Sequence, residues 1–254
     1  MIPPPTRTIR LLIAYDGTEF SGWQRQGRAR TVQGLIEDAL ARIHKEPVGL
    51  IGSGRTDAGV HAAGQVAHFH TNIAGMQAER FVPALNGLLP QDIRILDARE
   101  TLPDFHARFD AKARTYRYHF ILGRPGLPHE LRYALQLWRI PRLGLLNEYG
   151  RLLKGETSCS LFAVPRDPSK SRRRFISAAS FFIEGQTLIF EIRANAFLWK
   201  MVRSIAGSLL YYEERSVPPD DLRRFILSGD RRRAGPTLPP QGLFLWKIDY
   251  YRGE

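Results

Sequence analysis

The chain has 254 residues, of which 43% are hydrophobic, so it can bury a sizeable core and is not a disordered basic protein. Its formal net charge of +12 favours a polyanionic partner such as nucleic acid, with a merely solvated basic surface as the alternative. A single cysteine, Cys159, excludes an internal disulfide and a zinc site built from several cysteines. Neither a membrane span nor a signal peptide is recognisable, which predicts a cytoplasmic protein.

The N-terminal half is predicted to follow the order strand, helix, strand, strand, helix, strand. Thr8–Tyr15 is rich in Ile and Leu and ends at the turn signal Asp16-Gly17. Thr31 is a candidate N-cap for a helix whose apolar residues recur at helical spacing, namely Val32, Leu35, Ile36, Leu40 and Ile43. The remaining elements are expected at Val48–Ile51, Gln65–Thr71, Gln77–Leu88 and Ile93–Ala98.

The C-terminal half repeats this order with extra helical segments. Arg114–Leu122 alternates aromatic with polar residues, which indicates a half-buried strand. Helical patterns follow around His129–Trp138 and Leu145–Leu153, and Glu184-Gly185-Gln186 indicates a hairpin between two strands, Phe175–Ile183 and Thr187–Arg193. The last elements are predicted as two helices and a strand, at Ala196–Tyr212, Pro219–Leu227 and Leu243–Tyr250.

Two halves with split β-α-β order predict an α+β protein of two ferredoxin-like units. We expect an N-terminal domain over residues 1–108 and a C-terminal domain over residues 109–254. Their antiparallel sheets are expected to join, with a central cleft between the two units.

The first candidate for chemistry is a Gly-rich loop around Asp57. It places one carboxylate beside Arg55 and between small residues, in the run Gly52-Ser53-Gly54-Arg55-Thr56-Asp57-Ala58-Gly59-Val60-His61-Ala62. Such residues let another backbone come close at no steric cost. The alternative is an ordinary turn former.

A second candidate is the segment from Phe105-His106-Ala107-Arg108-Phe109 to Tyr116. Aromatic residues alternate here with arginines, a mixture that stacks on bases while holding phosphates. For Tyr116 the alternative is a buried aromatic on the inner face of a sheet.

The third candidate is the predicted helix around Arg203. Helical periodicity places Arg203 nearly opposite the apolar face, beside Lys200 and Gly207, and so predicts a solvated side chain. Only a partner that covers this face would give Arg203 a function. A further stretch, Arg166–Arg174, is predicted to be a mobile basic loop that contacts phosphates, with a solvated loop as the alternative.

In this context, Gly54–Ala62 resembles the catalytic motif of the tRNA pseudouridine synthase A family. Four further segments match the family in order and spacing, so the resemblance spans nearly the whole chain: Ala14–Gln26, Phe105–Tyr118, Ala194–Ser208 and Ala234-Gly235-Pro236-Thr237 with Gly242-Leu243-Phe244-Leu245. The chain departs from the family pattern at Gly155–Phe162 and at Tyr211–Arg215.

The resemblance implies a site and a reaction. Asp57 would be the catalytic carboxylate, paired with Arg203, and Tyr116 would stack on the flipped base. Arg55 would brace the space that the base vacates, and Leu243 would form an apolar wall against the uracil. Because uracil is detached, rotated and rejoined through C5, neither a cofactor nor a metal is required.

The resemblance also implies the substrate, uridines at positions 38 to 40 of the tRNA anticodon arm, and a homodimer. Two other classes remain open from the residues alone. One is a non-catalytic RNA-binding protein of RRM-like fold, although the RNP-type aromatic pattern is absent. The other is a glycosidase-like hydrolase, which needs a second carboxylate that no neighbouring motif offers to Asp57.

Overall fold

The computed structural model describes residues 6–165 and 167–250, which fall into two compact units. One unit is built from the chain up to Lys112 and from Leu245 onward, and the other from Ala113–Phe244. This partition differs from the predicted boundary between residues 108 and 109 by four residues and in the placement of the last strand.

The first unit is a split β-α-β arrangement. Its strands follow the order β4-β1-β3, with β1 antiparallel to both neighbours, while the short β2 and the last strand β10 both pair with β3. The elements are β1 (Arg7–Tyr15), α1 (Val32–His44), β2 (Leu50–Gly52), β3 (His61–Thr71), the 3₁₀ turn η1 (Ala78–Arg80), α2 (Phe81–Asn86), β4 (Ile93–Thr101) and β10 (Leu243–Asp249). The six elements predicted for this half are therefore confirmed, with shifted ends.

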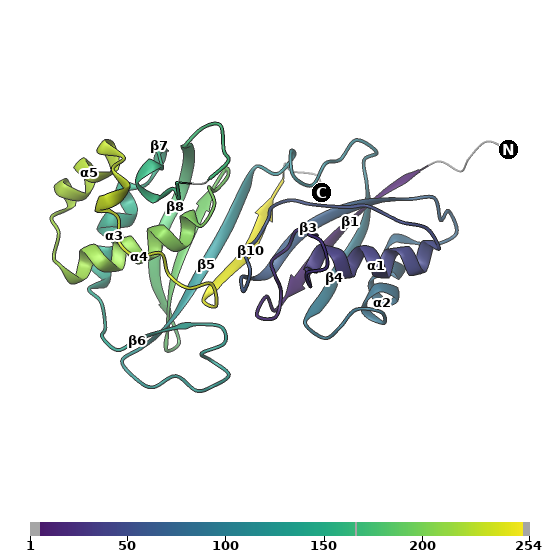
Figure 1. The fold of residues 1–254 in the computed structure, drawn as a ribbon, viewed down its shortest axis with the longest axis horizontal. Helices are drawn as coiled ribbons and strands as arrows, with labels where there is room; N and C mark the ends of the chain where they lie inside the picture. Colours follow the sequence, from purple (N-terminus) through teal and green to yellow (C-terminus); the bar gives the residue numbers. More distant parts are fainter. Residues whose placement is uncertain (1–5, 166, 251–254) are drawn as a thin grey trace. The chain divides into compact units, whose positions relative to one another are not determined.

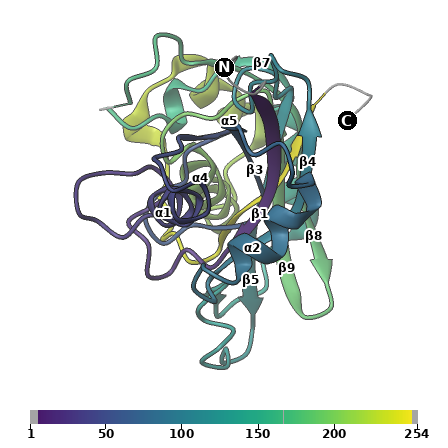
Figure 2. The same cartoon turned by 90° about the vertical axis from the view of Figure 1, so that its right-hand side faces the viewer.

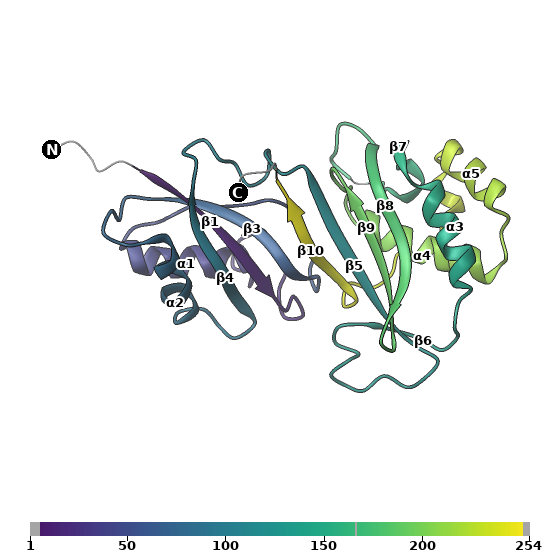
Figure 3. The same cartoon turned by 180° about the vertical axis from the view of Figure 1, so that it is seen from behind.

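One face of this sheet forms the core of the first unit. On β1 the alternate residues Ile9, Leu11 and Ile13 are fully buried, as the period of a strand requires. The helices α1 and α2 lie next to each other along the strands (Figures 1 and 3). The predicted cap is present, since the Thr31 hydroxyl accepts a hydrogen bond from the Gly34 N–H at 3.3 Å.

The second unit has an antiparallel sheet in the order β5-β9-β8-β7, with the short β6 parallel to β5. In Figure 3 the strands β5, β9 and β8 run side by side, and the β8–β9 hairpin projects at the lower right of Figure 2. The elements are β5 (Ala113–Leu122), β6 (Leu135–Leu137), α3 (Leu143–Leu152), β7 (Gly155–Ser158), η2 (Ser160–Phe162), β8 (Arg173–Glu184), β9 (Thr187–Ala194), α4 (Met201–Glu214), α5 (Pro219–Ser228) and η3 (Arg231–Arg233).

One helix predicted for this unit is wrong. Residues 129–134 form turns and Leu135–Leu137 is a strand that pairs with β5, where a helix was expected over His129–Trp138. The turns are held by side chains: Arg124 pairs with Glu130 at 2.6 Å, and the Gln136 amide donates to the Arg124 carbonyl at 2.7 Å. These contacts add to isolated turn hydrogen bonds, such as that from the Leu131 N–H to the Leu127 carbonyl, and hold the segment as turns instead of a continuous helix.

The helix that carries Arg203 begins later than its pattern predicts. Ala196–Tyr212 was the expected range, but α4 starts at Met201 because Lys200 has a φ of 58°, in the left-handed region. The hairpin of β8 and β9 and the helix α5 match their predictions closely.

The fold class is thus α+β with largely antiparallel sheets, as the sequence predicts. Among the described residues, none of the helices has the length and apolarity needed to cross a lipid bilayer.

Candidate active site

The Asp57 loop is held on both sides by the backbone of residues 20–23. The Trp23 N–H donates to the Thr56 carbonyl at 3.1 Å, and the Gly59 N–H donates to the Phe20 carbonyl at 3.3 Å. The loop is also held by a side-chain hydrogen bond, since the Thr56 hydroxyl lies 2.8 Å from the buried hydroxyl of Tyr15 on β1. Asp57 is therefore presented from a fixed backbone, with a half-buried side chain.

Two glycines in the facing segment make this close approach possible. A Cβ at Gly22, where φ is +92°, would lie 2.6 Å from the Thr56 carbonyl oxygen. A Cβ at Gly17 would lie 2.0 Å from the Val60 carbonyl oxygen. Both distances are shorter than any real contact, so neither site accepts a side chain. The sequence pointed to the glycines of the loop itself. This is borne out at Gly52, where a Cβ would lie 2.6 Å from the Trp23 ring, but not at Gly54, which has open space around it.

Arg55 lies beside Asp57 and is exposed. Its Nε donates to the Gln24 side-chain oxygen at 2.9 Å, and Gln24 in turn donates to Gln33 of α1 at 2.6 Å. The guanidinium of Arg55 is thus held through its Nε atom by Gln24.

In the second unit, Tyr116 is half-buried in β5 opposite Ile192 of β9. Its ring makes a T-shaped contact with Phe197, with ring centroids 5.1 Å apart and planes at 84°. Phe197 belongs to the non-helical segment that leads into α4. This contact restricts the tilt of the Tyr116 ring.

Arg203 is half-buried, so its predicted position as a solvated side chain is wrong. Its Nε donates to the Leu238 carbonyl at 2.6 Å, and the Leu238 N–H donates to the Arg203 carbonyl at 3.3 Å. One turn further along α4, a Cβ at Gly207 would lie 1.9 Å from the Pro236 carbonyl oxygen. The segment 235–240 therefore covers the polar face of α4, which no periodicity within the helix can reveal.

A buried tyrosine secures the same segment. The Tyr118 hydroxyl donates to the Pro239 carbonyl at 2.7 Å. Burial raises the pKa of Tyr118, and the positive charge of Arg203 opposes that rise only in part. The phenol thus remains a hydrogen-bond donor at neutral pH.

The approach to α4 is fixed by Asp167, whose side chain is buried. Its carboxylate accepts a hydrogen bond from the Trp199 N–H at 2.5 Å and forms an ion pair with Arg172 at 3.3 Å. Burial opposes ionisation of Asp167, but its hydrogen bonds outweigh burial and hold its pKa below the ordinary value.

The basic stretch 166–174 is consequently only partly available to a phosphate. Arg172 is committed to Asp167, and Arg173 pairs with Glu156 at 3.0 Å as the first residue of β8. Lys170 is exposed. Arg166 lies outside the described residues.

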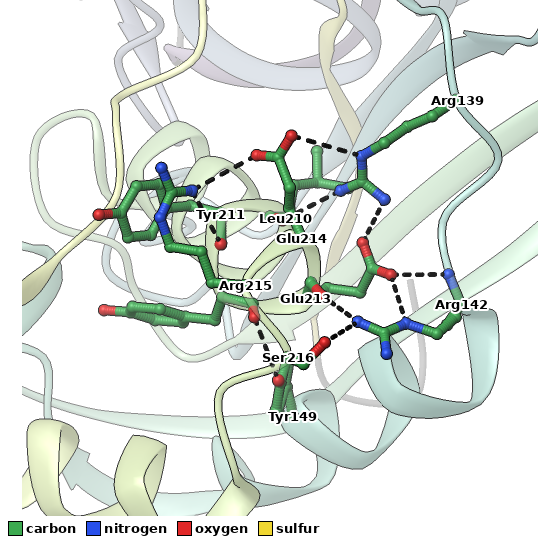
Figure 4. A network of polar contacts seen from close by, with 10 residues as sticks. Arg139, Arg142, Tyr149, Leu210, Tyr211, Glu213, Glu214, Arg215 and Ser216 are labelled. Atoms are coloured by element: carbon green, nitrogen blue, oxygen red, sulfur yellow. Dashed lines mark hydrogen bonds and ion pairs between the residues drawn. The ribbon is translucent and has the colours of Figure 1, made fainter.

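The far end of α4 is fixed by Glu213, which is 2% exposed (Figure 4). Its carboxylate accepts the Arg142 N–H at 3.0 Å and the Arg142 Nε at 2.9 Å, and it pairs with Arg139. Burial opposes ionisation of Glu213, yet these hydrogen bonds outweigh burial and lower its pKa. This clamp lies in the stretch 211–215, one of the two places where the sequence is expected to depart from the family pattern.

Leu243 is buried, 5% exposed, at the start of β10. Its N–H donates to the Pro240 carbonyl at 2.8 Å, which ties the strand to the segment that covers Arg203. The predicted site residues are therefore divided. Asp57 and Arg55 belong to the first unit and Tyr116 and Arg203 to the second, which also includes Leu243 because the boundary between the units falls inside β10, after Phe244.

Comparison with known proteins identifies the family. The family model described as tRNA pseudouridine synthase matches residues 11–110 and 151–251. The chain belongs to this family. The tRNA pseudouridine synthase A of Treponema denticola is 51% identical over 96% of this chain and 93% of the relative. Those of Treponema pallidum and an Exiguobacterium species are 48% and 40% identical, over 91% and 96% of this chain and 84% and 98% of the relatives.

Among solved structures, a crystal structure of a Cbf5-Nop10-Gar1 complex matches with a TM-score of 0.32 at 13% identity, over 79% of this chain and 53% of that chain. A match of this size supports no argument. As a tRNA pseudouridine synthase, the protein is an isomerase that turns uridine into pseudouridine in tRNA.

Proposed function

We propose that this synthase modifies uridines at positions 38, 39 and 40 in the tRNA anticodon stem-loop, with Asp57 as the catalytic carboxylate. The observation that carries the proposal is the Asp57 loop itself. Its backbone is locked between Phe20 and Trp23, while the carboxylate stays half-buried and reachable. A rigid carboxylate is what a positioned nucleophile or base needs.

The reaction needs only a carboxylate and a proton acceptor. Asp57 either bonds to C1′ as the glycosidic bond breaks or removes a sugar proton to give a glycal. The uracil then rotates and C5 bonds to C1′. On the first route the Asp57–C1′ bond breaks as this bond forms, and on the second route Asp57 returns the abstracted proton to C2′. In both cases the C5 proton is finally lost and N1 is protonated, by way of solvent or a side chain. Product and substrate are isomers, so neither a cofactor nor a metal is consumed.

The second unit supplies the partners of Asp57 in this proposal. Arg203 is proposed to pair with Asp57 and keep it ionised. Its guanidinium is already oriented by the Leu238 carbonyl at 2.6 Å, which supports a fixed role. Leu243 is proposed as the apolar wall against the uracil.

Tyr116 is proposed to stack on the flipped uracil. The side chain is half-buried, and its T-shaped contact with Phe197 supports a fixed ring orientation for stacking. Tyr116→Phe should keep much of the activity, whereas Tyr116→Ala should lose it. Equal, near-wild-type activity of both variants would rule out this role.

Arg55 is proposed to fill the space left in the stack, because a base has to leave a paired stem before C1′ is reached. Its exposure supports this role. We further propose a cytoplasmic homodimer that acts on tRNA, in keeping with the single cysteine and the basic charge of the chain.

The test is incubation with unmodified tRNA transcripts, followed by mapping of pseudouridine. Wild-type protein should modify positions 38 to 40. Asp57→Asn, which is nearly isosteric, should fold and bind tRNA but form no pseudouridine. Asp38→Asn, an exposed carboxylate on α1, is the matched control and should leave the activity unchanged. Modification elsewhere in the tRNA would contradict the position, and an active Asp57→Asn variant would contradict the mechanism.

A further inference from the structure

In the first unit, the segment 102–110 lies on the face of the sheet away from α2. Phe69 of β3 contacts Phe81 of α2, so the preceding residue in the strand, His68, points to the opposite face. There the His68 Nδ1 accepts the Ala107 N–H at 3.1 Å. The Tyr250 hydroxyl donates to the Ala107 carbonyl at 2.7 Å and holds the segment from its other side.

This segment presents an aromatic pair. The rings of His106 and Phe109 stack with centroids 4.3 Å apart and planes at 27°. The His106 Nδ1 accepts the N–H groups of Arg108 and Phe109 at 3.2 and 3.3 Å, and the His106 N–H donates to Asp110 at 2.7 Å. The pair is thus formed before any ligand binds.

Phe109 is nevertheless 72% exposed. A side chain of this size normally stabilises the fold by being buried, and this chain leaves that stabilisation unused here. A rigid, exposed ring is a surface on which a flat ligand stacks at little cost in entropy.

The segment carries both charges: Asp104 is exposed and the Asp110 carboxylate is engaged by the His106 N–H, while a cation lies next to the Phe109 ring. The Arg108 guanidinium carbon lies 5.7 Å from the centre of the Phe109 ring, and both Arg108 and Lys112 are exposed. An aromatic ring with a cation beside it matches a nucleotide, whose base stacks while its phosphate meets the cation.

We propose that His106 and Phe109 form a second base-binding site for the tRNA, with Arg108 on the adjacent phosphate. The inference rests on tRNA being the substrate. This site differs from the uracil pocket, because the Asp57 loop enters β3 at His61, whereas the segment sits over His68. At about 3.4 Å per residue these two positions are about 24 Å apart along the strand.

The test measures the affinity for an unmodified tRNA transcript by fluorescence anisotropy. Phe109→Leu, which keeps apolar bulk but removes the ring, should weaken binding about tenfold, while Phe109→Tyr should stay within about twofold of wild type. Leu102→Ala is the matched control, since Leu102 is 65% exposed in the same segment. It should bind as wild type does.

Two further readouts separate stacking from charge and from folding. Phe109→Leu should leave the slope of log affinity against log salt unchanged, whereas Arg108→Gln should reduce it by about 0.7–0.9. At saturating tRNA, Phe109→Leu should form pseudouridine at the wild-type rate, so that only KM rises.

Wild-type binding by Phe109→Leu would overturn the proposal, as would an equal loss in Leu102→Ala. A changed oligomeric state of Phe109→Leu in sedimentation, with tRNA binding intact, would mean that the patch meets protein and would also overturn it. Pseudouridine mapping with wild-type protein tests the proposed function separately, because that result does not depend on Phe109.

Discussion

The two regions that carry the proposed catalytic groups are built in different ways. The Asp57 loop is held by backbone hydrogen bonds to residues 20–23 and by glycines that allow two backbone segments to come close. The helix α4, which carries Arg203, is held by side chains and segments far away in sequence: Asp167, Arg139, Arg142 and residues 235–240. A compact motif therefore identifies the first region, whereas the second depends on tertiary packing.

The largest expected effect tests the role of Arg203. Arg203→Met keeps much of the bulk but leaves Asp57 without its proposed cation, so kcat should fall about 100-fold or more. Affinity for tRNA should change much less. Arg223→Met, at an exposed position on α5, is the control and should keep wild-type kcat. Single-turnover kinetics at saturating tRNA provide the measurement, and a near-normal kcat for Arg203→Met would contradict the assignment.

The clamp at the end of α4 should matter more for stability than for chemistry. Glu213→Gln removes the buried charge that faces Arg139 and Arg142, so the free energy of unfolding should fall by about 2–3 kcal/mol. The control is Glu214→Gln, whose exposed pairing with Arg215 should contribute less than about 1 kcal/mol. Urea unfolding measures both.

The pH dependence of this clamp has a definite sign. Because the pKa of Glu213 is lowered in the folded state, its contribution is present above the ordinary carboxyl pKa and is lost as pH falls through the lowered one. The stability gap between wild type and Glu213→Gln should therefore close in acid. A gap that persists there would mean that packing, not charge, makes the difference.

The contact between α4 and the segment 235–240 can be broken with one methyl group. Gly207→Ala would place a Cβ 1.9 Å from the Pro236 carbonyl oxygen and should destabilise the protein by about 1–3 kcal/mol. Gly144→Ala on α3 meets nothing within 4 Å and should be neutral or stabilising by up to about 1 kcal/mol. Thermal unfolding of the pair measures the difference. Equal changes in stability for both variants would mean that helix propensity, and not the contact with the segment 235–240, determines the effect of Gly207→Ala.

The last effect concerns the sheet of the first unit and is compared at pH 5. Burial, together with the charges of His106 and His70, lowers the pKa of His68 to about 4. The unfolded chain takes up a proton near pH 6.5, so stability should fall as pH drops from about 6.5 to about 4, by about 1–2 kcal/mol at pH 5. His68→Asn keeps an acceptor for the Ala107 N–H and should flatten this dependence in urea titrations. If the stability of His68→Asn depended on pH as that of wild type does, His68 would not be the group responsible.

Local patterns predicted most of the secondary structure, and the reason is physical. Thr31 caps α1 and Gly185, with φ +60°, turns the β8–β9 hairpin, because caps and turns depend on neighbours in the chain. The helix expected over His129–Trp138 does not form, because the side chains bind a loop instead. Gln136 donates to the Arg124 carbonyl, and Glu130 accepts the Leu127 N–H and pairs with the Arg124 guanidinium. Those partners are set by folding and not by spacing.

The sequence by itself determined the family, the Asp57 loop and the α+β class, since each depends on short runs of residue types in a fixed order. Only the tertiary structure decided that Arg203 is covered, that Arg172 serves Asp167 and that Phe109 stands exposed on His106. The pattern of residues along a helix or loop predicts the contacts that a side chain makes within its own element. What lies above that face comes from a segment tens of residues away, such as 235–240 over α4, and is settled only when the chain packs.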